Sequence, residues 1–158
     1  MLNEVARVLR PNGLFLSGEW ERCPTFADPS LRNSNSIPAT SHLFNLIDDA
    51  MFTSHGVIPI ASHIPSWLAE SGHFRDITSQ KYAVPIGDWH PEPSMQALGN
   101  ALRHALQLST NGLKLILKEP KLGLEEAQID ELVMGYVQEM YHVSGMVAVY
   151  HTVHARSI

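Results

Sequence analysis

Hydrophobic positions along this chain change repeatedly between helical and strand spacing, and this alternation predicts a mixed α/β fold. Apolar residues at helical spacing predict helices over residues 1–10, 41–55, 65–70, 93–119 and 124–140. Short apolar runs predict strands over residues 14–19, 74–84 and 146–153. The polar stretch 21–40, rich in Pro, Ser and Asn, is expected to form a surface loop.

The ends of these elements carry recognisable signals. Pro11-Asn12-Gly13 stops the first helix, since Pro cannot continue it and Asn and Gly tolerate a left-handed backbone. Thr40 or Ser41 is expected to cap the second helix, and Gly56 and Gly72 suit the positions just after the second and third helices. Asn111-Gly112 predicts a kink or break in the fourth helix. The last strand begins with apolar residues on both faces, which is typical of a central strand.

Three segments, residues 7–16, 67–74 and 85–89, resemble segments of class I S-adenosylmethionine-dependent methyltransferases. Residues 7–16, Arg-Val-Leu-Arg-Pro-Asn-Gly-Leu-Phe-Leu, are similar to the turn that joins the helix after the fourth strand to the fifth strand of that family. Asn12 replaces the first of the two usual glycines, which Asn's tolerance of positive φ permits. Residues 67–74 resemble the entry to the family's sixth strand. Residues 85–89, with Glu19-Trp20, resemble the secondary-metabolite branch seen in fungi.

The resemblance implies one methyltransferase-like domain over residues 1–158, corresponding to the C-terminal half of a Rossmann-like fold. It implies three main strands in the spatial order first, last, second, with the last strand antiparallel to the other two. Four or five helices would accompany them. The N-terminal half, which holds most of the cofactor in this family, has no counterpart in these residues.

The glycines of the chain bear directly on whether it can bind the family's cofactor. The family binds its cofactor over a glycine-rich turn, whereas the ten glycines here are isolated and no G-x-G occurs. Methyl transfer depends on positioning the sulfonium in line with the acceptor. We therefore expect a truncated, methyltransferase-like chain that neither binds S-adenosylmethionine nor catalyses methyl transfer alone. The alternative is a non-enzymatic interaction protein or small-ligand-binding protein on the same scaffold.

An acceptor pocket, where one exists, would be built in this family from the exit of the fifth strand and the inserted helices. One charged residue and five apolar or aromatic residues are its candidate lining: Glu19, Trp20, Met51, Phe52, Trp89 and Tyr141. An apolar or aromatic acceptor would suit such a lining. Ordinary core packing is the competing explanation for each apolar residue, and a solvated strand end is the competing explanation for Glu19.

Bulk properties and the remaining reactive residues exclude several other classes. A net charge of −5 without a Lys or Arg cluster argues against nucleic acid or an anionic membrane as partner. No apolar run approaches the ~20 residues of a membrane span. The single cysteine, Cys23, rules out an intramolecular disulfide, so the cytoplasm is the expected location. His151 and His154 should lie on opposite faces of a strand, so no metal site is expected there.

The first strand also predicts how the chain assembles. Without a fourth strand beside it, the strand Leu14 to Glu19 would keep one open edge and apolar side chains on both faces. No charge or Pro protects Leu14 to Ser17. We therefore expect a homodimer, formed either by pairing of these edges or by swapping of an element such as Met1 to Arg10.

Overall fold

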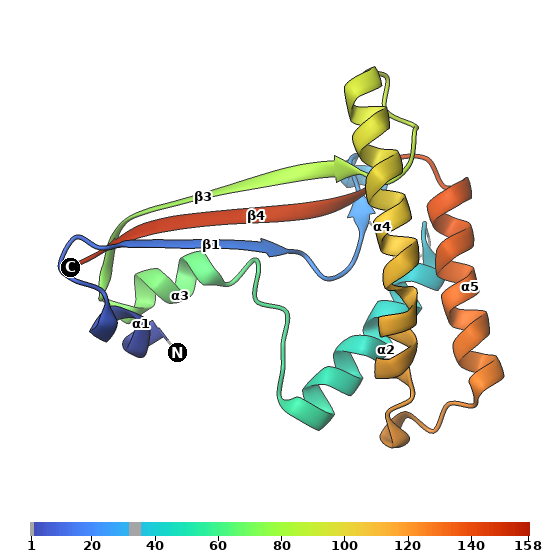
Figure 1. The fold of residues 1–158 in the computed structure, drawn as a ribbon, viewed down its shortest axis with the longest axis horizontal. Helices are drawn as coiled ribbons and strands as arrows, with labels where there is room; N and C mark the ends of the chain where they lie inside the picture. The colour runs from blue at the N-terminus through green and yellow to red at the C-terminus, as the bar shows by residue number, and fades with distance from the viewer. Residues whose placement is uncertain (1, 32–35) are drawn as a thin grey trace. The chain divides into compact units, whose positions relative to one another are not determined.

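The structure of the chain is a computed structural model that describes residues 2–31 and 36–158 (Figure 1). Within them lie five α-helices: α1 Leu2–Val8, α2 Pro38–His55, α3 Ile64–Ser71, α4 Pro93–Leu117 and α5 Glu126–His142. The strands are β1 Leu14–Trp20, β2 Thr25–Phe26, β3 Phe74–Pro85 and β4 Met146–Ser157, and 3₁₀ turns occupy Pro29–Leu31 and Pro120–Leu122. The chain divides into two compact units, which are described in turn.

The first unit consists of Met1–Glu21, Pro59–Tyr82 and Val149–Ile158. Its centre is β4, which pairs with β1 on one side and with β3 on the other, and runs antiparallel to both (Figure 1). Along the first pairing, Leu14 lies opposite Arg156 and Trp20 lies opposite Tyr150. The expected order of first, last and second strand, with an antiparallel last strand, is confirmed.

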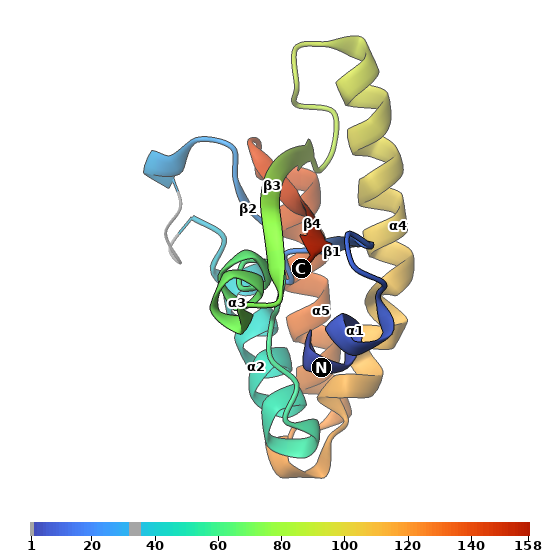
Figure 2. The same cartoon turned by 90° about the vertical axis from the view of Figure 1, so that its left-hand side faces the viewer.

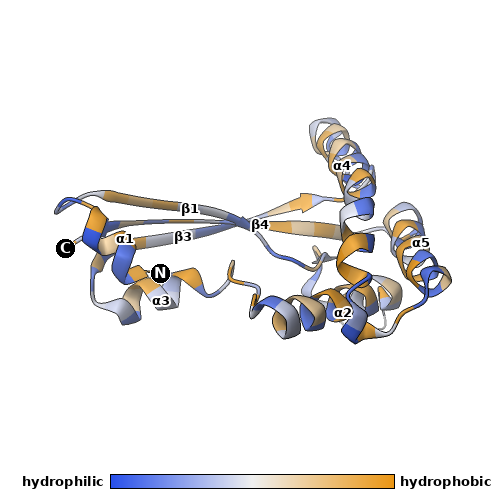
Figure 3. Ribbon diagram, turned by 60° about the horizontal axis from the view of Figure 1, so that its bottom comes forward, coloured by the Kyte–Doolittle hydropathy of each residue, from blue (hydrophilic) through white to orange (hydrophobic). Residues whose placement is uncertain are grey.

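One face of this three-stranded sheet is covered by the two short helices α1 and α3 (Figures 1 and 3). Phe15 of β1 and Phe74 of β3 meet there with their ring centroids 5.6 Å apart. Leu68 of α3 is fully buried in the same cluster as Val153 and Ala155 of β4. Burial of this apolar face is the main stabilisation of the unit, since hydrophobic burial is the dominant favourable term in folding.

The turn between α1 and β1 has the conformation that its sequence predicts. Asn12 has a φ of 63°, in the left-handed region. A Cβ on Gly13 would lie 2.8 Å from the carbonyl oxygen of Arg10, so the residue that follows Asn12 must be small. The Ser157 hydroxyl of β4 ties the turn down: it donates to Arg10 O at 2.6 Å and accepts from Gly13 N at 3.0 Å.

The second unit consists of Arg22–Ile58 and Ala83–Ala148, and its body is the three helices α2, α4 and α5, packed side by side (Figure 2). Tyr136 of α5 is fully buried among them, with the ring of Phe44 from α2 edge-on at 5.4 Å. The two-residue strand β2 pairs antiparallel with the start of β4, where Met146, Val147 and Ala148 are all buried. The prediction that β4 begins as a central strand is therefore confirmed.

Three predicted features of the second unit differ in the structure. The expected loop 21–40 contains β2, a 3₁₀ turn and the first residues of α2, while its residues 32–35, like Met1, lie outside the described residues. The expected caps Thr40 and Ser41 lie inside α2, which begins at Pro38. The predicted kink or break at Asn111-Gly112 is wrong as a break, because α4 runs unbroken to Leu117. Burial of Leu117 against the core outweighs the penalty of one helical glycine, about 1 kcal/mol.

The helices also bear on membrane insertion. Across the part of the chain that the structure describes, none has both the length and the apolar character needed to cross a bilayer.

Candidate functional site

The six residues predicted to line an acceptor pocket fall on four separate segments: β1, α2, the loop after β3, and α5. Glu19 and Trp20 belong to β1 in the first unit, and the other four residues belong to the second unit. Of those four, the structure brings Trp89 and Tyr141 together in the wall of one cavity of about 120 Å³. Met51 lines a different cavity, and Phe52 is exposed on α2.

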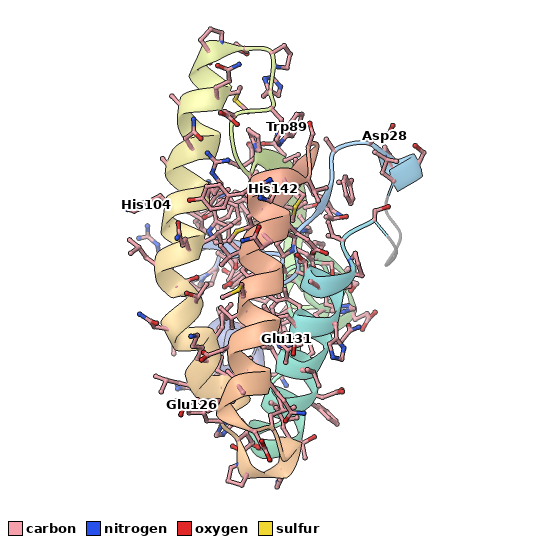
Figure 4. The ribbon with its side chains drawn as sticks, turned by 90° about the vertical axis from the view of Figure 1, so that its right-hand side faces the viewer. Asp28, Trp89, His104, Glu126, Glu131 and His142 are labelled. Carbon is pink, nitrogen blue, oxygen red and sulfur yellow. The ribbon has the colours of Figure 1, made fainter. Side chains whose placement is uncertain are left out.

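The cavity shared by Trp89 and Tyr141 lies where the loop after β3 meets α4 and the end of α5. Figure 4 shows Trp89 and His142 near the same end of α5. The Trp89 indole is fixed in place because its Nε1–H donates to the carbonyl oxygen of Met146, at 3.0 Å. A neighbouring aromatic, His90, lies with its ring centroid 5.6 Å from that of Trp89. The wall is therefore held by a backbone contact as well as by packing.

A close crossing of two glycines brings α4 against this loop. A Cβ on Gly99 would lie only 2.0 Å from the carbonyl oxygen of Gly87, so no larger residue can replace Gly99 without movement of the backbone. Gly87 N in turn donates to Gly99 O at 2.9 Å. Because Arg103 lies one helical turn after Gly99, the crossing brings its guanidinium to the cavity.

Arg103 is the functional candidate that the sequence analysis did not identify. Its guanidinium carbon lies 4.5 Å from the centroid of the Tyr141 ring, in cation–π geometry. One of its nitrogens donates to Asn100 Oδ1 at 2.6 Å, and another lies 3.8 Å from a carboxylate oxygen of Asp88. The Arg103 side chain is 17% exposed while that of Asp88 is 68% exposed, so the cation is held in the wall and its counter-charge lies in water.

This arrangement provides recognition chemistry. A guanidinium offers planar paired donors to a carboxylate or a phosphate, and the faces of Trp89 and Tyr141 offer contact to a flat apolar group. The spacing Gly99 to Arg103, on one face of a helix opposite a Gly87-Asp88-Trp89 loop, is the only sequence signal that could have indicated Arg103.

A second cavity is the larger and more open one. It has a volume of about 500 Å³ and lies between the start of α2 and the N-terminal half of α5, with His42 and Glu131 in its wall. The two helices approach closely there, since a Cβ on Gly135 would lie 2.9 Å from the Cβ of Ala39. Most of its lining residues are apolar, such as Leu124 and Leu132.

The other reactive residues considered from the sequence have structural partners. Arg22, which precedes Cys23 in the chain, forms an ion pair with Asp48. The Cys23 thiol donates to the carbonyl oxygen of Pro24 at 3.3 Å. As predicted, β4 carries His151 on its buried side and His154 on its exposed side. In residues 2–31 and 36–158, no three His, Cys, Asp or Glu side chains gather as a metal site would require.

Comparison with known proteins adds no relative to this description. A scan against protein-family models gives no match, and a search of curated proteins likewise finds none. Function is therefore inferred from the strand order, the turn at Asn12 and the cavity beside Arg103.

Proposed function

We propose that the chain is a methyltransferase-like scaffold, equivalent to the C-terminal half of the class I S-adenosylmethionine-dependent fold, and that it does not methylate a substrate by itself. The observation that carries the proposal is the sheet order β1–β4–β3 with an antiparallel β4. That order is what the resemblance implies for the fifth, seventh and sixth strands. The positive φ of Asn12, at the position of a family glycine, supports the same assignment.

The proposed lack of activity follows from the glycines. In this family a glycine-rich turn lets the backbone approach the cofactor, and here the ten glycines include no G-x-G pair. The five glycines with positive φ, which include Gly56 and Gly72, all lie outside the helices and strands. Without such a cradle the sulfonium would not be positioned for transfer. With one cysteine and no disulfide to form, we place this scaffold in the cytoplasm.

Isothermal titration with S-adenosylmethionine tests this proposal. We expect no binding in the micromolar range, and the same result with S-adenosylhomocysteine. A complete class I methyltransferase titrated under the same conditions is the positive control. Micromolar affinity for the isolated chain would overturn the inactive assignment, because it would require a cofactor site built from these residues alone.

A second candidate function, small-ligand binding, is favoured by one specific observation. Arg103 is held in a cavity wall against the ring of Tyr141, with Trp89 in the same wall and with a counter-ion that is itself mostly in water. A planar carboxylate of modest size would meet both the guanidinium and the ring faces. The cavity volume of about 120 Å³ restricts such a ligand to roughly the size of one substituted ring.

Benzoate is a suitable probe for this second candidate, with neutral benzamide as the matched control ligand. We expect benzoate, more than benzamide, to shift the indole N–H resonance of Trp89. The variant Arg103→Gln should abolish the difference between the two ligands, whereas Arg75→Gln in the first unit should leave it unchanged. Equal shifts with both ligands, or no shift, would remove the anion-binding candidate and leave the methyltransferase-like assignment untouched.

A further inference from the structure

The strand β1 leaves one of its two faces in water, and that face is apolar. Along the strand, exposed and half-buried residues alternate, with the odd-numbered side chains on the face covered by α1 and α3. The even-numbered side chains face outward: Leu14 is 51% exposed, Leu16 is 69% exposed and Trp20 is 49% exposed. Exposed apolar residues gathered on one strand are typical of an interaction surface.

The same residues also carry the free hydrogen-bonding edge of the strand. Ser157 N donates to Gly13 O at 3.0 Å and Glu21 N donates to Val149 O at 2.7 Å, so odd-numbered residues point their backbone groups toward β4. In an antiparallel ladder the groups of the intervening residues point the opposite way. The N–H and C=O groups of Leu14, Leu16, Gly18 and Trp20 therefore point away from β4. No strand of the described residues pairs with that edge.

The opposite edge of the same sheet, formed by β3, carries features that prevent it from pairing with another strand. On β3, Asp76 has a φ of 54°, which interrupts the regular strand backbone, and Arg75 forms an ion pair with it. Lys81 stands further along the same strand and is exposed. Charged side chains and irregular backbone are devices that prevent edge strands from pairing. The strand β1 has neither at Leu14 to Gly18.

We propose that β1 pairs with β1 of a second copy of this chain, antiparallel, about a two-fold axis at Ser17. This register overlaps all seven residues of the strand. It places Leu14 opposite Trp20 of the second copy and Leu16 opposite Gly18 of the second copy. The β1–β4–β3 parts of the two sheets then join side by side, and the free edge of β1 is paired in each copy.

The register is self-complementary in size and in charge. The large Trp20 meets the medium-sized Leu14, while Leu16 meets a glycine, so no two large side chains compete for the same space. Glu19, the only charged residue of β1, lies opposite Phe15 of the second copy, so that the two carboxylates do not face each other. These features favour a second copy over an unrelated strand as the occupant of the edge, because every residue of β1 finds a suitable partner in its own sequence.

Sedimentation equilibrium of the full chain and of two lysine variants tests the proposed surface. We expect a dimer at micromolar concentration and at least tenfold weaker dimerisation for Leu16→Lys, which would place a charge in the centre of the joined edges. The matched control is Leu108→Lys, the same change at an exposed leucine of α4, and it should leave dimerisation unchanged. A monomeric wild-type chain, or a dimer that Leu16→Lys does not weaken, would overturn the proposal.

A cross-link tests the register and does not depend on how well the lysine variant folds. In the proposed dimer, Ser17 of one copy lies opposite Ser17 of the second copy in a non-hydrogen-bonded pair. Their Cα atoms are then about 4.5 Å apart, inside the range that a disulfide can span. In a Cys23→Ser background, Ser17→Cys should therefore give a disulfide-linked dimer on mild oxidation. The control Thr78→Cys on β3 should not. A dimer in which Ser17→Cys stays reduced, as a swap of α1 would give, contradicts this register.

Discussion

The imidazole of His151 and the carboxylate of Glu21 are in contact, with 2.9 Å between Nε2 and Oε2. The His151 side chain is 5% exposed and the Glu21 side chain is 31% exposed. The contact ties the residue just after β1 to the middle of β4, next to the backbone hydrogen bond from Glu21 N to Val149 O.

Removal of the carboxylate should therefore destabilise the sheet. The change Glu21→Ala leaves the buried imidazole of His151 without this polar partner, and we expect a loss of about 1–3 kcal/mol in the free energy of unfolding. Urea denaturation followed by circular dichroism measures it. Glu19→Ala, at the half-buried residue directly opposite His151 in the β1–β4 pairing, is the matched control and should cost less. Equal losses for both variants would show that the pair itself contributes nothing.

The sequence predicted the strands that carry His151 and its neighbours, but not the contact between His151 and Glu21. Strand alternation correctly separated His151 from His154, since period-two geometry alone decides which side chains share a face. Glu21, and not the predicted site residue Glu19, contacts His151. Which of the two carboxylates does so depends on the register between β1 and β4. Register is set by tertiary pairing across more than a hundred residues, which no local pattern encodes.

The two glycines of α4 should respond in opposite directions to the same substitution. Gly99→Ala would drive a methyl group into the carbonyl of Gly87, and we expect a loss of roughly 2–3 kcal/mol of stability. Gly112→Ala has open space around the new methyl and should gain about 0.5–1 kcal/mol from helix propensity. Thermal and urea unfolding of both variants provides the comparison. A destabilising Gly112→Ala would mean that the helix is not regular at that position.

The sequence predicted helix ends most reliably where the backbone preference of a single residue decides where the helix stops. Gly56 and Gly72 end their helices with φ of 63° and 68°, as predicted from sequence alone. The predicted start of α2 failed because its N-terminus is satisfied from elsewhere in the chain. Ile37 stands at the cap position and provides no side-chain hydrogen bond, while Glu139 of α5 binds the first backbone N–H groups. A partner one hundred residues away leaves no trace in the local pattern.

This distant cap supports a prediction of its own. The Glu139 carboxylate accepts from Ala39 N at 2.9 Å and from Thr40 N at 2.7 Å, at the positive end of the α2 dipole. Glu139→Ala should lower the free energy of unfolding by about 1–2 kcal/mol, the usual value of a lost N-cap. Glu139→Gln keeps one acceptor oxygen and should lose less. The exposed neighbour Gln138→Ala controls for the change in helix propensity and should be nearly neutral.

The candidate cavity was predictable in part for similar reasons. Trp89 and Tyr141 were selected for their residue type and their segments, and the structure brings them into one wall. Arg103 was not selected, because a single basic residue on a long amphipathic helix is usually a solvated side chain. Only the contact between Gly87 and Gly99, which depends on how the loop and the helix pack, brings this guanidinium to the ring of Tyr141.

The phenol of Tyr136 gives the last prediction, because it is buried without a hydrogen-bond partner among the described residues. Burial raises the pKa of Tyr136 well above its usual value, and the nearby Cys23 raises it further. Tyr136→Phe keeps the ring against Phe44 and removes the unsatisfied hydroxyl, so stability at neutral pH should rise by about 1 kcal/mol. Tyr141→Phe, which loses an exposed hydrogen bond to Gln107, is the control and should not be stabilising.

The same group fixes the sign of an alkaline effect. In the unfolded chain Tyr136 loses its proton near pH 10, while in the folded chain it retains the proton to higher pH. The folded state therefore binds more protons above pH 10, and its stability must fall there, by up to about 1.4 kcal/mol per pH unit. Urea unfolding at pH 9 to 11 should show a steeper decline for the wild type than for Tyr136→Phe. Parallel declines in the two proteins would mean that the Tyr136 phenol reaches water in the folded state.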